Sequence, residues 1–306
     1  MFAYRGMSRA LTIKKGRPNM RTLYALSALL LGATGTMASA ADGPELHGFG
    51  EVSVKNDYVT PRGLVVTTGG ATVQVLNGLV LVLPSGIAFH AGTWTDLNPG
   101  YSKADGNITT VNEFDFFFGV SGDIAPGLKA GVEYVQFISG QPSVAFQDER
   151  NIEFSLKYSD APDAAFSFNP YAKVFWAVSS KSSTVVLGKT GKTFDVEIGA
   201  VPTLKSGAVT LSAPTWFTVG PKSYWLTKAN ATAFGVDRKN FGVISTGLKV
   251  STPLSFIKGG AGASIFASAQ YFHLVNDGLQ VSKALLNSGD SKRDHVVFGG
   301  GIGFNF

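Results

Sequence analysis

The chain has 306 residues, of which 44% are hydrophobic and only 15% charged, with 37 glycines, 23 phenylalanines and no cysteine. This composition excludes an acidic disordered chain and a highly charged helical bundle, and it excludes disulfides and thiolate metal sites. The formal charge of +5 comes from the first 40 residues, which hold six basic residues and no acid. The rest carries 20 Lys and Arg against 21 Asp and Glu, so nucleic acid is not an expected partner.

Residues 1–40 have the pattern of a secretory signal peptide. A basic segment precedes an apolar run that begins at Leu23, and Ala38-Ser39-Ala40 fits the small-residue cleavage site. A membrane anchor is the alternative, but an apolar run of about 10–14 residues is too short to span a bilayer. The basic segment is unusually long, so the true start could be Met1, Met7 or Met20. We expect residues 41–306 to be exported from a bacterial cytoplasm.

The exported part shows a hydrophobic period of two instead of a helical period. Residues 113–120, 128–134, 152–158 and 193–200 each alternate apolar residues with polar or small ones. Such alternation is typical of strands with one apolar face and one polar face. Extending it along the chain predicts about twelve strands, near residues 46–57, 70–83, 86–97, 110–121, 128–138, 150–158, 165–178, 192–201, 208–219, 240–252, 262–275 and 294–306.

Short and long connections alternate between these strands. Short ones are expected at residues 84–85, 122–127, 159–164, 202–207 and 253–261. Longer ones are expected at residues 58–69, 98–109, 139–149, 179–191, 220–239 and 276–293. Outer-membrane barrels have short periplasmic turns and long extracellular loops. The sequence therefore predicts an all-β fold, a transmembrane up-and-down antiparallel β-barrel of about 12 strands with both termini on the periplasmic side.

A barrel in lipid must turn its charges toward the lumen, because charge facing lipid is costly. The expected register gives a pore-lining set of ten residues, with Lys173 on the same face: Glu51, Lys55, Glu113, Asp115, Lys129, Glu133, Glu153, Lys157, Asp195 and Glu197. These charges either set the selectivity of a water-filled pore or pair with one another, and both interpretations stay open.

The last predicted strand ends with Phe304-Asn305-Phe306, and its aromatic residues share one face. This arrangement resembles the assembly signal of bacterial outer-membrane barrels. We therefore expect Phe304 and Phe306 to be recognised by the barrel-assembly machinery. The alternative is an ordinary buried last strand.

No catalytic or cofactor site is predicted. The four histidines, His47, His90, His273 and His295, lack the spacing of a zinc site, and the glycine pairs and triplets are not followed by a helix that could bind phosphate. A serine–histidine pair at the membrane rim remains as an alternative. We expect no metal and no cofactor.

Residues 55–63 read Lys-Asn-Asp-Tyr-Val-Thr-Pro-Arg-Gly, and a glutamine follows on the next predicted strand. In this spacing Tyr58, Arg62, Gly63 and Gln74 resemble the opening of the TorF-like putative porins of proteobacteria. Pro61 and Leu64-Val65-Val66 depart from that family's pattern. The resemblance, which covers about 20 residues, implies an outer-membrane channel. We expect Arg62 to anchor the first long loop at the pore mouth, with Asp57 as its nearest acid, or to be an ordinary residue of a solvated loop.

The sequence thus favours an outer-membrane porin-like channel for passive diffusion of small hydrophilic solutes. Twelve strands enclose a narrower lumen than the 16 of a general porin. Two alternatives remain, a non-conducting barrel that scaffolds or binds cell-envelope partners, and a barrel enzyme acting on lipid.

Overall fold

The computed structural model describes residues 43–68, 70–99, 111–140, 148–160, 164–179, 185–256 and 262–306. The expected signal peptide, residues 1–40, lies outside the described residues. Within the described part, no helix is long and apolar enough to cross a bilayer.

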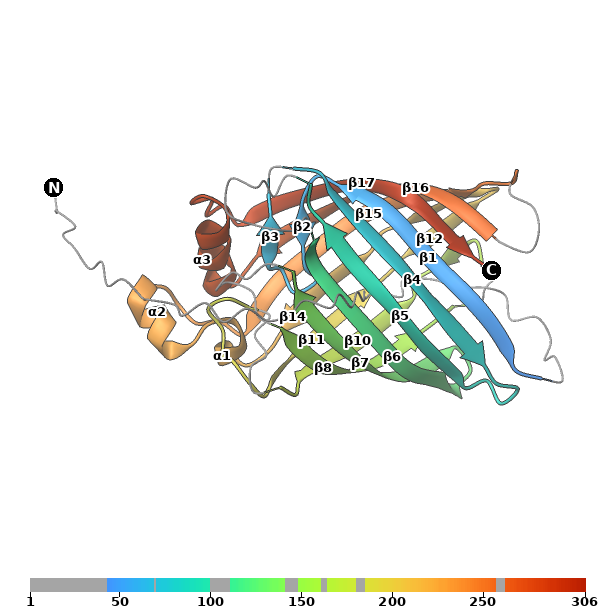
Figure 1. Ribbon diagram of the computed structural model, residues 1–306, viewed down its shortest axis with the longest axis horizontal. Coiled ribbons are helices and arrows are strands. Elements are labelled where there is room, and N and C mark those ends of the chain that lie inside the picture. The colour runs from blue at the N-terminus through green and yellow to red at the C-terminus, as the bar shows by residue number, and fades with distance from the viewer. Residues whose placement is uncertain are drawn as a thin grey trace, which may run out of the picture.

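Antiparallel strands form one closed wall (Figure 1). The ring runs β14-β11-β10-β8-β7-β6-β5-β4-β1-β17-β16-β15, and pairing of β15 with β14 closes it. The prediction of an up-and-down barrel of twelve strands is therefore confirmed. The strands of the ring are β1 (Glu45–Lys55), β4 (Thr72–Val82), β5 (Ala88–Leu97), β6 (Val111–Ala125), β7 (Leu128–Ser139), β8 (Glu149–Tyr158), β10 (Pro170–Ala177), β11 (Thr193–Ala200), β14 (Thr215–Val219), β15 (Phe241–Pro253), β16 (Gly262–Leu274) and β17 (Asp294–Asn305).

Three of these strands continue, after a short break, into a second segment. β9 (Phe166–Ser167) precedes β10, β12 (Thr203–Ser206) follows β11, and β13 (Val209–Ser212) precedes β14. Pro202 and Pro214 lie at two of the breaks, where a residue without an N–H cannot join the ladder. The expected connection at residues 202–207 is therefore mostly strand, and the turn lies at Gly207, whose φ is +58°.

The wall has an apolar outer face. On β8, Phe154 and Leu156 are 41% and 44% exposed, whereas Glu153, which precedes Phe154, is 5% exposed. The same alternation leaves apolar side chains exposed along the other strands, as in Val52, Leu79, Phe118, Ile198, Leu248 and Ile302. A ring that satisfies its backbone hydrogen bonds and exposes such side chains fits the hydrocarbon of a bilayer.

The two ends of the barrel differ. Tight turns join β4 to β5 and β6 to β7 at the end where β1 begins and β17 ends, on the right in Figure 1. The opposite end carries α1 (Lys222–Trp225), α2 (Lys228–Phe234) and α3 (Asp277–Leu286), which the strand pattern did not predict. It also carries a hairpin of β2 (Tyr58–Val59) and β3 (Val65–Thr67). We call this end the loop end.

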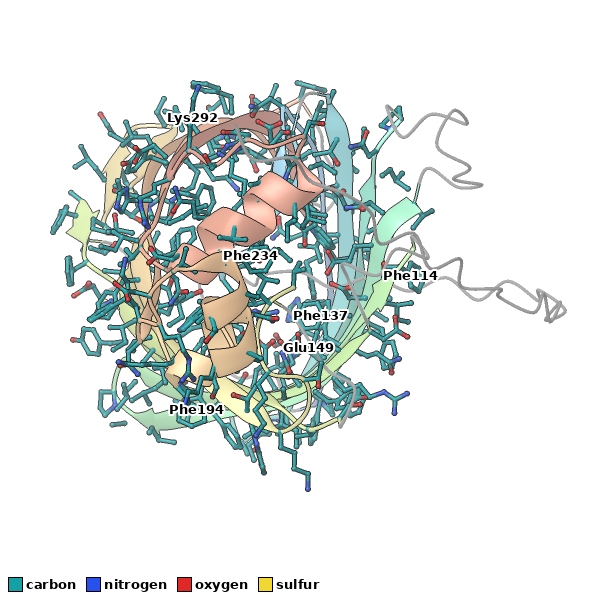
Figure 2. The ribbon with its side chains drawn as sticks, turned by 90° about the vertical axis from the view of Figure 1, so that its left-hand side faces the viewer. Phe114, Phe137, Glu149, Phe194, Phe234 and Lys292 are labelled. Atoms are coloured by element: carbon teal, nitrogen blue, oxygen red, sulfur yellow. The ribbon has the colours of Figure 1, made fainter. Side chains whose placement is uncertain are left out.

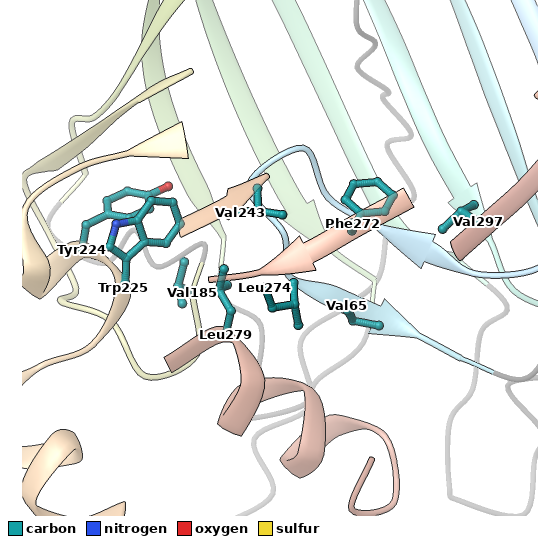
Figure 3. Packing of buried hydrophobic residues seen from close by; sticks show 9 residues of the cluster. All are labelled: Val65, Val185, Tyr224, Trp225, Val243, Phe272, Leu274, Leu279 and Val297. Atoms are coloured by element: carbon teal, nitrogen blue, oxygen red, sulfur yellow. The ribbon is translucent and has the colours of Figure 1, made fainter. Parts of the chain in front are cut away.

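A hydrophobic cluster lies at the loop end, between the loops and the wall (Figure 3). The loops contribute Val65, Val185, Leu279 and the edge-to-face pair Tyr224 and Trp225, whose ring centroids are 4.6 Å apart. The wall contributes Val243, Phe272, Leu274 and Val297. We call these nine residues the mouth cluster. It fixes α1, α3 and the β2–β3 hairpin against the β15–β17 side of the barrel.

Candidate channel lumen

All ten predicted pore-lining residues lie on the face of the wall opposite the apolar exterior. Cross-strand pairing shows this directly, because residues paired across neighbouring strands share a face. Glu153 pairs with Glu133 and Phe175, Phe175 pairs with Asp195, and Glu113 pairs with Asp96. The full set on the inner face is Glu51, Lys55, Glu113, Asp115, Lys129, Glu133, Glu153, Lys157, Asp195 and Glu197, together with Lys173.

The first long loop folds back into the barrel instead of extending from it. At the tip of the β2–β3 hairpin, Arg62 is only 3% exposed and its Nη2 lies 3.9 Å from Oε1 of Glu149. The guanidinium carbon also lies 5.0 Å from the ring centre of Phe137 and 4.8 Å from that of Phe175. Figure 2, which faces the loop end, shows Phe137 and Glu149 inside the ring of strands. We call Phe137, Glu149 and Phe175 the Arg62 cage.

The base of the hairpin is bonded to a second carboxylate. The hydroxyl of Tyr58 donates a hydrogen bond of 2.6 Å to Oε2 of Glu113 on β6. Burial and the negative charges of Glu113 and Asp115 raise the pKa of Tyr58 well above its ordinary value, so the phenol keeps its proton. The Tyr58 ring packs on Trp94 of β5, with centroids 5.3 Å apart.

Close packing explains why glycine follows Arg62. Gly63 has a φ of +85°, and a Cβ there would lie 2.8 Å from Cβ of Val243 and 3.1 Å from Cδ1 of Leu279. Only glycine fits both the left-handed conformation and the space. On the other arm of the hairpin, the amide of Asn287 donates to the carbonyl oxygen of Val65 at 3.1 Å.

Below the hairpin the wall charges pair with one another. Nζ of Lys173 lies 3.5 Å from Oε2 of Glu153, and Nε2 of His90 lies 2.8 Å from Oε2 of Glu133. The hydroxyl of Tyr171 donates to Glu197 at 2.8 Å. Toward the other end, Lys249 pairs with Glu51 at 3.2 Å, and both side chains are about a third exposed, at 36% and 32%. Access to water therefore increases away from the loop end.

Three charged residues of the inner face escaped the sequence prediction. Glu149 was assigned to a loop, but it begins β8 and faces Arg62. Asp96 accepts hydrogen bonds from Thr72, Gln74 and Asn112. Lys249 pairs with Glu51. The alternation of β5 places Asp96 on the inner face, and the alternation of β15 does the same for Lys249, so the sequence contained a signal for both. No local pattern identified Glu149.

Asp57, the nearest acid in the sequence, is not the carboxylate that Arg62 approaches. The structure places Oδ2 of Asp57 3.2 Å from Nε2 of His295, and Glu149 takes the place beside Arg62. The other histidines also contact carboxylates, His47 with Glu45, His90 with Glu133 and His273 with Asp294. Each of these four contacts joins a histidine to an acid, not to a serine.

Phe304 lies on the outer face of β17, where it pairs with β1, and Phe306 follows the last residue of that strand. Each ring covers a glycine of β1, because a Cβ added to Gly50 or Gly48 would lie 2.4 Å or 2.3 Å from the ring. Two backbone hydrogen bonds, of 2.6 and 2.9 Å, also join Phe306 to Gly48. The proposed assembly residues thus lie on the seam between the first and last strands of the ring.

Metal chemistry finds no support among the residues that the structure describes. No group of three or more histidine, aspartate or glutamate side chains in those ranges is arranged to hold a metal ion.

A closed ring of strands with an apolar outer face and a charged inner face defines a transmembrane β-barrel of the bacterial outer membrane.

No protein-family model matches the chain, and no curated protein matches its sequence. Among solved structures, it is similar to an outer membrane channel from Pseudomonas putida at 6% identity and a TM-score of 0.47, over 90% of this chain and 100% of that chain. It is also similar to the NanC porin, at 10% identity and a TM-score of 0.45, over 85% and 98% of the two chains. The translocator domain of the autotransporter NalP from Neisseria meningitidis gives 11% identity and a TM-score of 0.41, over 87% and 88%.

Proposed function

We propose that this protein is an outer-membrane channel that lets small hydrophilic solutes diffuse passively through its lumen. The observation that carries the proposal is a charged inner face with a hairpin of the chain held inside it. A purely structural barrel has no need of a lumen lined by so many ionisable groups, which are costly to bury unless they are paired or solvated. The ten predicted residues serve in this proposal as the pore lining.

The β2–β3 hairpin acts as the constriction. Arg62 lies at its tip, and the contacts with Glu149, Phe137 and Phe175 hold that tip on the β7–β10 side of the lumen. The mouth cluster covers the β15–β17 side. Solutes therefore pass beside the hairpin and are selected by the charges around it.

A non-conducting barrel that binds envelope partners is the second candidate. The mouth cluster favours it, because nine buried apolar side chains at the loop end resemble a permanent closure more than a gate. In that case α1, α2 and α3 present the binding surface.

The remaining parts of the proposal concern export and assembly. Residues 1–40 are removed as a signal peptide, and Phe304 and Phe306 are recognised by the barrel-assembly machinery. The spacing of Tyr58, Arg62, Gly63 and Gln74 supports membership of the TorF-like porins.

Single-channel recording in planar bilayers tests the proposal. The purified barrel should give discrete conductance steps, and Arg62→Ala should change their size or fluctuation by freeing the hairpin. Arg150→Ala is the matched control, because Arg150 follows Glu149 in the sequence but is exposed on the outer face of β8. A folded barrel without conductance steps would contradict the channel function and favour the scaffold.

A further inference from the structure

The Arg62 cage has the chemistry of a binding site for a cation. Two aromatic rings lie within 5.0 Å of the guanidinium carbon, and a carboxylate lies at their side. Aromatic faces attract cations, and carboxylates match the fork of a guanidinium group. The three cage residues come from three neighbouring strands, β7, β8 and β10, so the rigid wall and not the loop builds the cage.

Arg62 fills this cage imperfectly. Its shortest contact with Glu149 is 3.9 Å, which is too long for a hydrogen bond. Its Nε has no hydrogen-bond partner among the described residues, and neither does Oε2 of Glu149, which is 1% exposed. The neighbouring Asn151 is fully buried and its side chain interacts with Glu149, but neither of its polar atoms makes a hydrogen bond of good geometry in that same part of the chain. Buried polar groups left without partners are uncommon in native proteins.

The tether explains the poor fit. Arg62 reaches the cage from a hairpin that Tyr58, Gly63 and the contact between Val65 and Asn287 hold in place. A free guanidinium ion is not tethered, so it can move toward Glu149 and form two parallel hydrogen bonds of about 2.8 Å.

Acidic side chains outnumber basic side chains around the cage. Arg62 interacts electrostatically with Glu149, Asp195 and Glu153, and Lys173 is the cation paired with Glu153. The described acids and histidines are not grouped to hold a metal ion. The surroundings therefore favour an organic cation with a flat, delocalised charge over a compact divalent metal.

We infer that the Arg62 cage recognises solutes bearing a guanidinium group, and that Arg62 occupies it as a tethered substitute for such a solute. The inference rests on the proposed channel function, because a solute must enter the lumen to reach the cage. An arriving solute displaces Arg62, takes its place between Phe137 and Phe175, and frees the tip of the hairpin.

Calorimetric titration of the detergent-solubilised barrel with ethylguanidinium tests the inference without requiring conduction. Arg62→Ala empties the cage, so it should bind ethylguanidinium about tenfold more tightly than the wild type, because the solute no longer has to displace the two ring contacts of Arg62. Adding Glu149→Gln to Arg62→Ala should remove that gain. Arg150→Ala should bind as the wild type does, and ethylammonium, which lacks the planar fork, should bind Arg62→Ala more weakly than ethylguanidinium.

Heat-modifiable gel mobility establishes that each variant is folded, and Arg62→Gln replaces Arg62→Ala if the alanine variant does not fold. Equal affinity of the wild type and the folded Arg62 variant, or tight binding that survives Glu149→Gln, would overturn the inference. The channel function is read separately from bilayer recordings. Conductance without ethylguanidinium binding contradicts only the inference, and binding without conductance contradicts only the channel.

Discussion

The indole Nε1 of Trp216 donates a hydrogen bond of 3.0 Å to the carbonyl oxygen of Pro61. Trp216 lies on β14, whereas the ring contacts of Arg62 come from β7 and β10. The tip of the hairpin is therefore held by neighbouring residues that bind to different parts of the wall. Trp216 also packs against the mouth cluster, so this bond links the hairpin to the covered side of the barrel.

Trp216→Phe should loosen the hairpin without disturbing the wall. The substitution removes the indole donor but keeps an aromatic ring, so the loss is that of one partly buried hydrogen bond, about 1 kcal/mol. Because that free energy corresponds to roughly a fivefold change in a conformational equilibrium, single-channel records should show the displaced state of the hairpin occupied about five times more, relative to the held state. Trp176→Phe, on the lipid-facing side of β10, is the control. Identical records for the two variants would mean that the bond does not restrain the hairpin.

Arginine substitutions on β8 should separate the two faces of the wall. Phe154→Arg introduces a charge toward lipid and should cost about 2–4 kcal/mol if the residue lies near the bilayer midplane. Ser155→Arg should cost much less, because residue 155 shares the inner face with Glu153 and Lys157. Urea unfolding of barrels refolded into lipid vesicles measures both values. A larger cost for Ser155→Arg would reverse the assignment of faces.

Phe306 allows packing and assembly to be distinguished. Phe306→Ala should lower the amount of protein in the outer membrane, because it removes the proposed assembly residue. Gly48→Ala keeps the aromatic residue but displaces its ring, since the three atoms nearest the new Cβ all belong to Phe306. Gly48→Ala should leave the amount of protein in the outer membrane unchanged. Gly43→Ala should do the same, because no atom lies within 4 Å of a Cβ at that position. Equal losses for Phe306→Ala and Gly48→Ala would assign the effect to packing at the seam.

Protection of α3 should depend on pH only in strong acid. Burial alone would raise the pKa of Asp277, but hydrogen bonds from Lys239 and Arg293 outweigh it and hold the pKa below the usual 3.8. At the other end of the helix, the bond from Lys283 likewise lowers the pKa of Asp290. The stabilisation is therefore complete above the ordinary aspartate pKa and is lost as the pH falls through the lowered values.

Hydrogen exchange of the α3 amides should consequently be slow and nearly constant, after correction for intrinsic rates, from pH 8 to about 4. Asp277→Asn should exchange faster over that whole range. A transition near neutral pH in the wild type would show that other groups control the helix.

The sequence predicted the wall well because each strand carries its own evidence. Residues 152–158 alternate strictly, and an inner and an outer face follow from that alternation alone. The inward hairpin has no such local signal. Glu149, beside Arg62, lies 87 positions along the chain and was assigned to a loop, so the direction of the hairpin depends on contacts that only the closed ring creates. Helix α1 could not be predicted from the sequence for a similar reason. Its four residues are too few to show a hydrophobic period, and Trp225 is buried only by tertiary packing.

The positions of the four tryptophans give the protein a built-in optical reporter. Trp94 packs on Tyr58, Trp216 is bonded to Pro61, and Trp225 lies in the mouth cluster with the hairpin residue Val65. Trp176, by contrast, is 43% exposed on the outer face. In a Trp176→Phe protein, all indole emission would come from side chains that surround the hairpin. Displacement of that hairpin by a solute would then be visible as a shift in fluorescence of the detergent-solubilised protein, with no label attached.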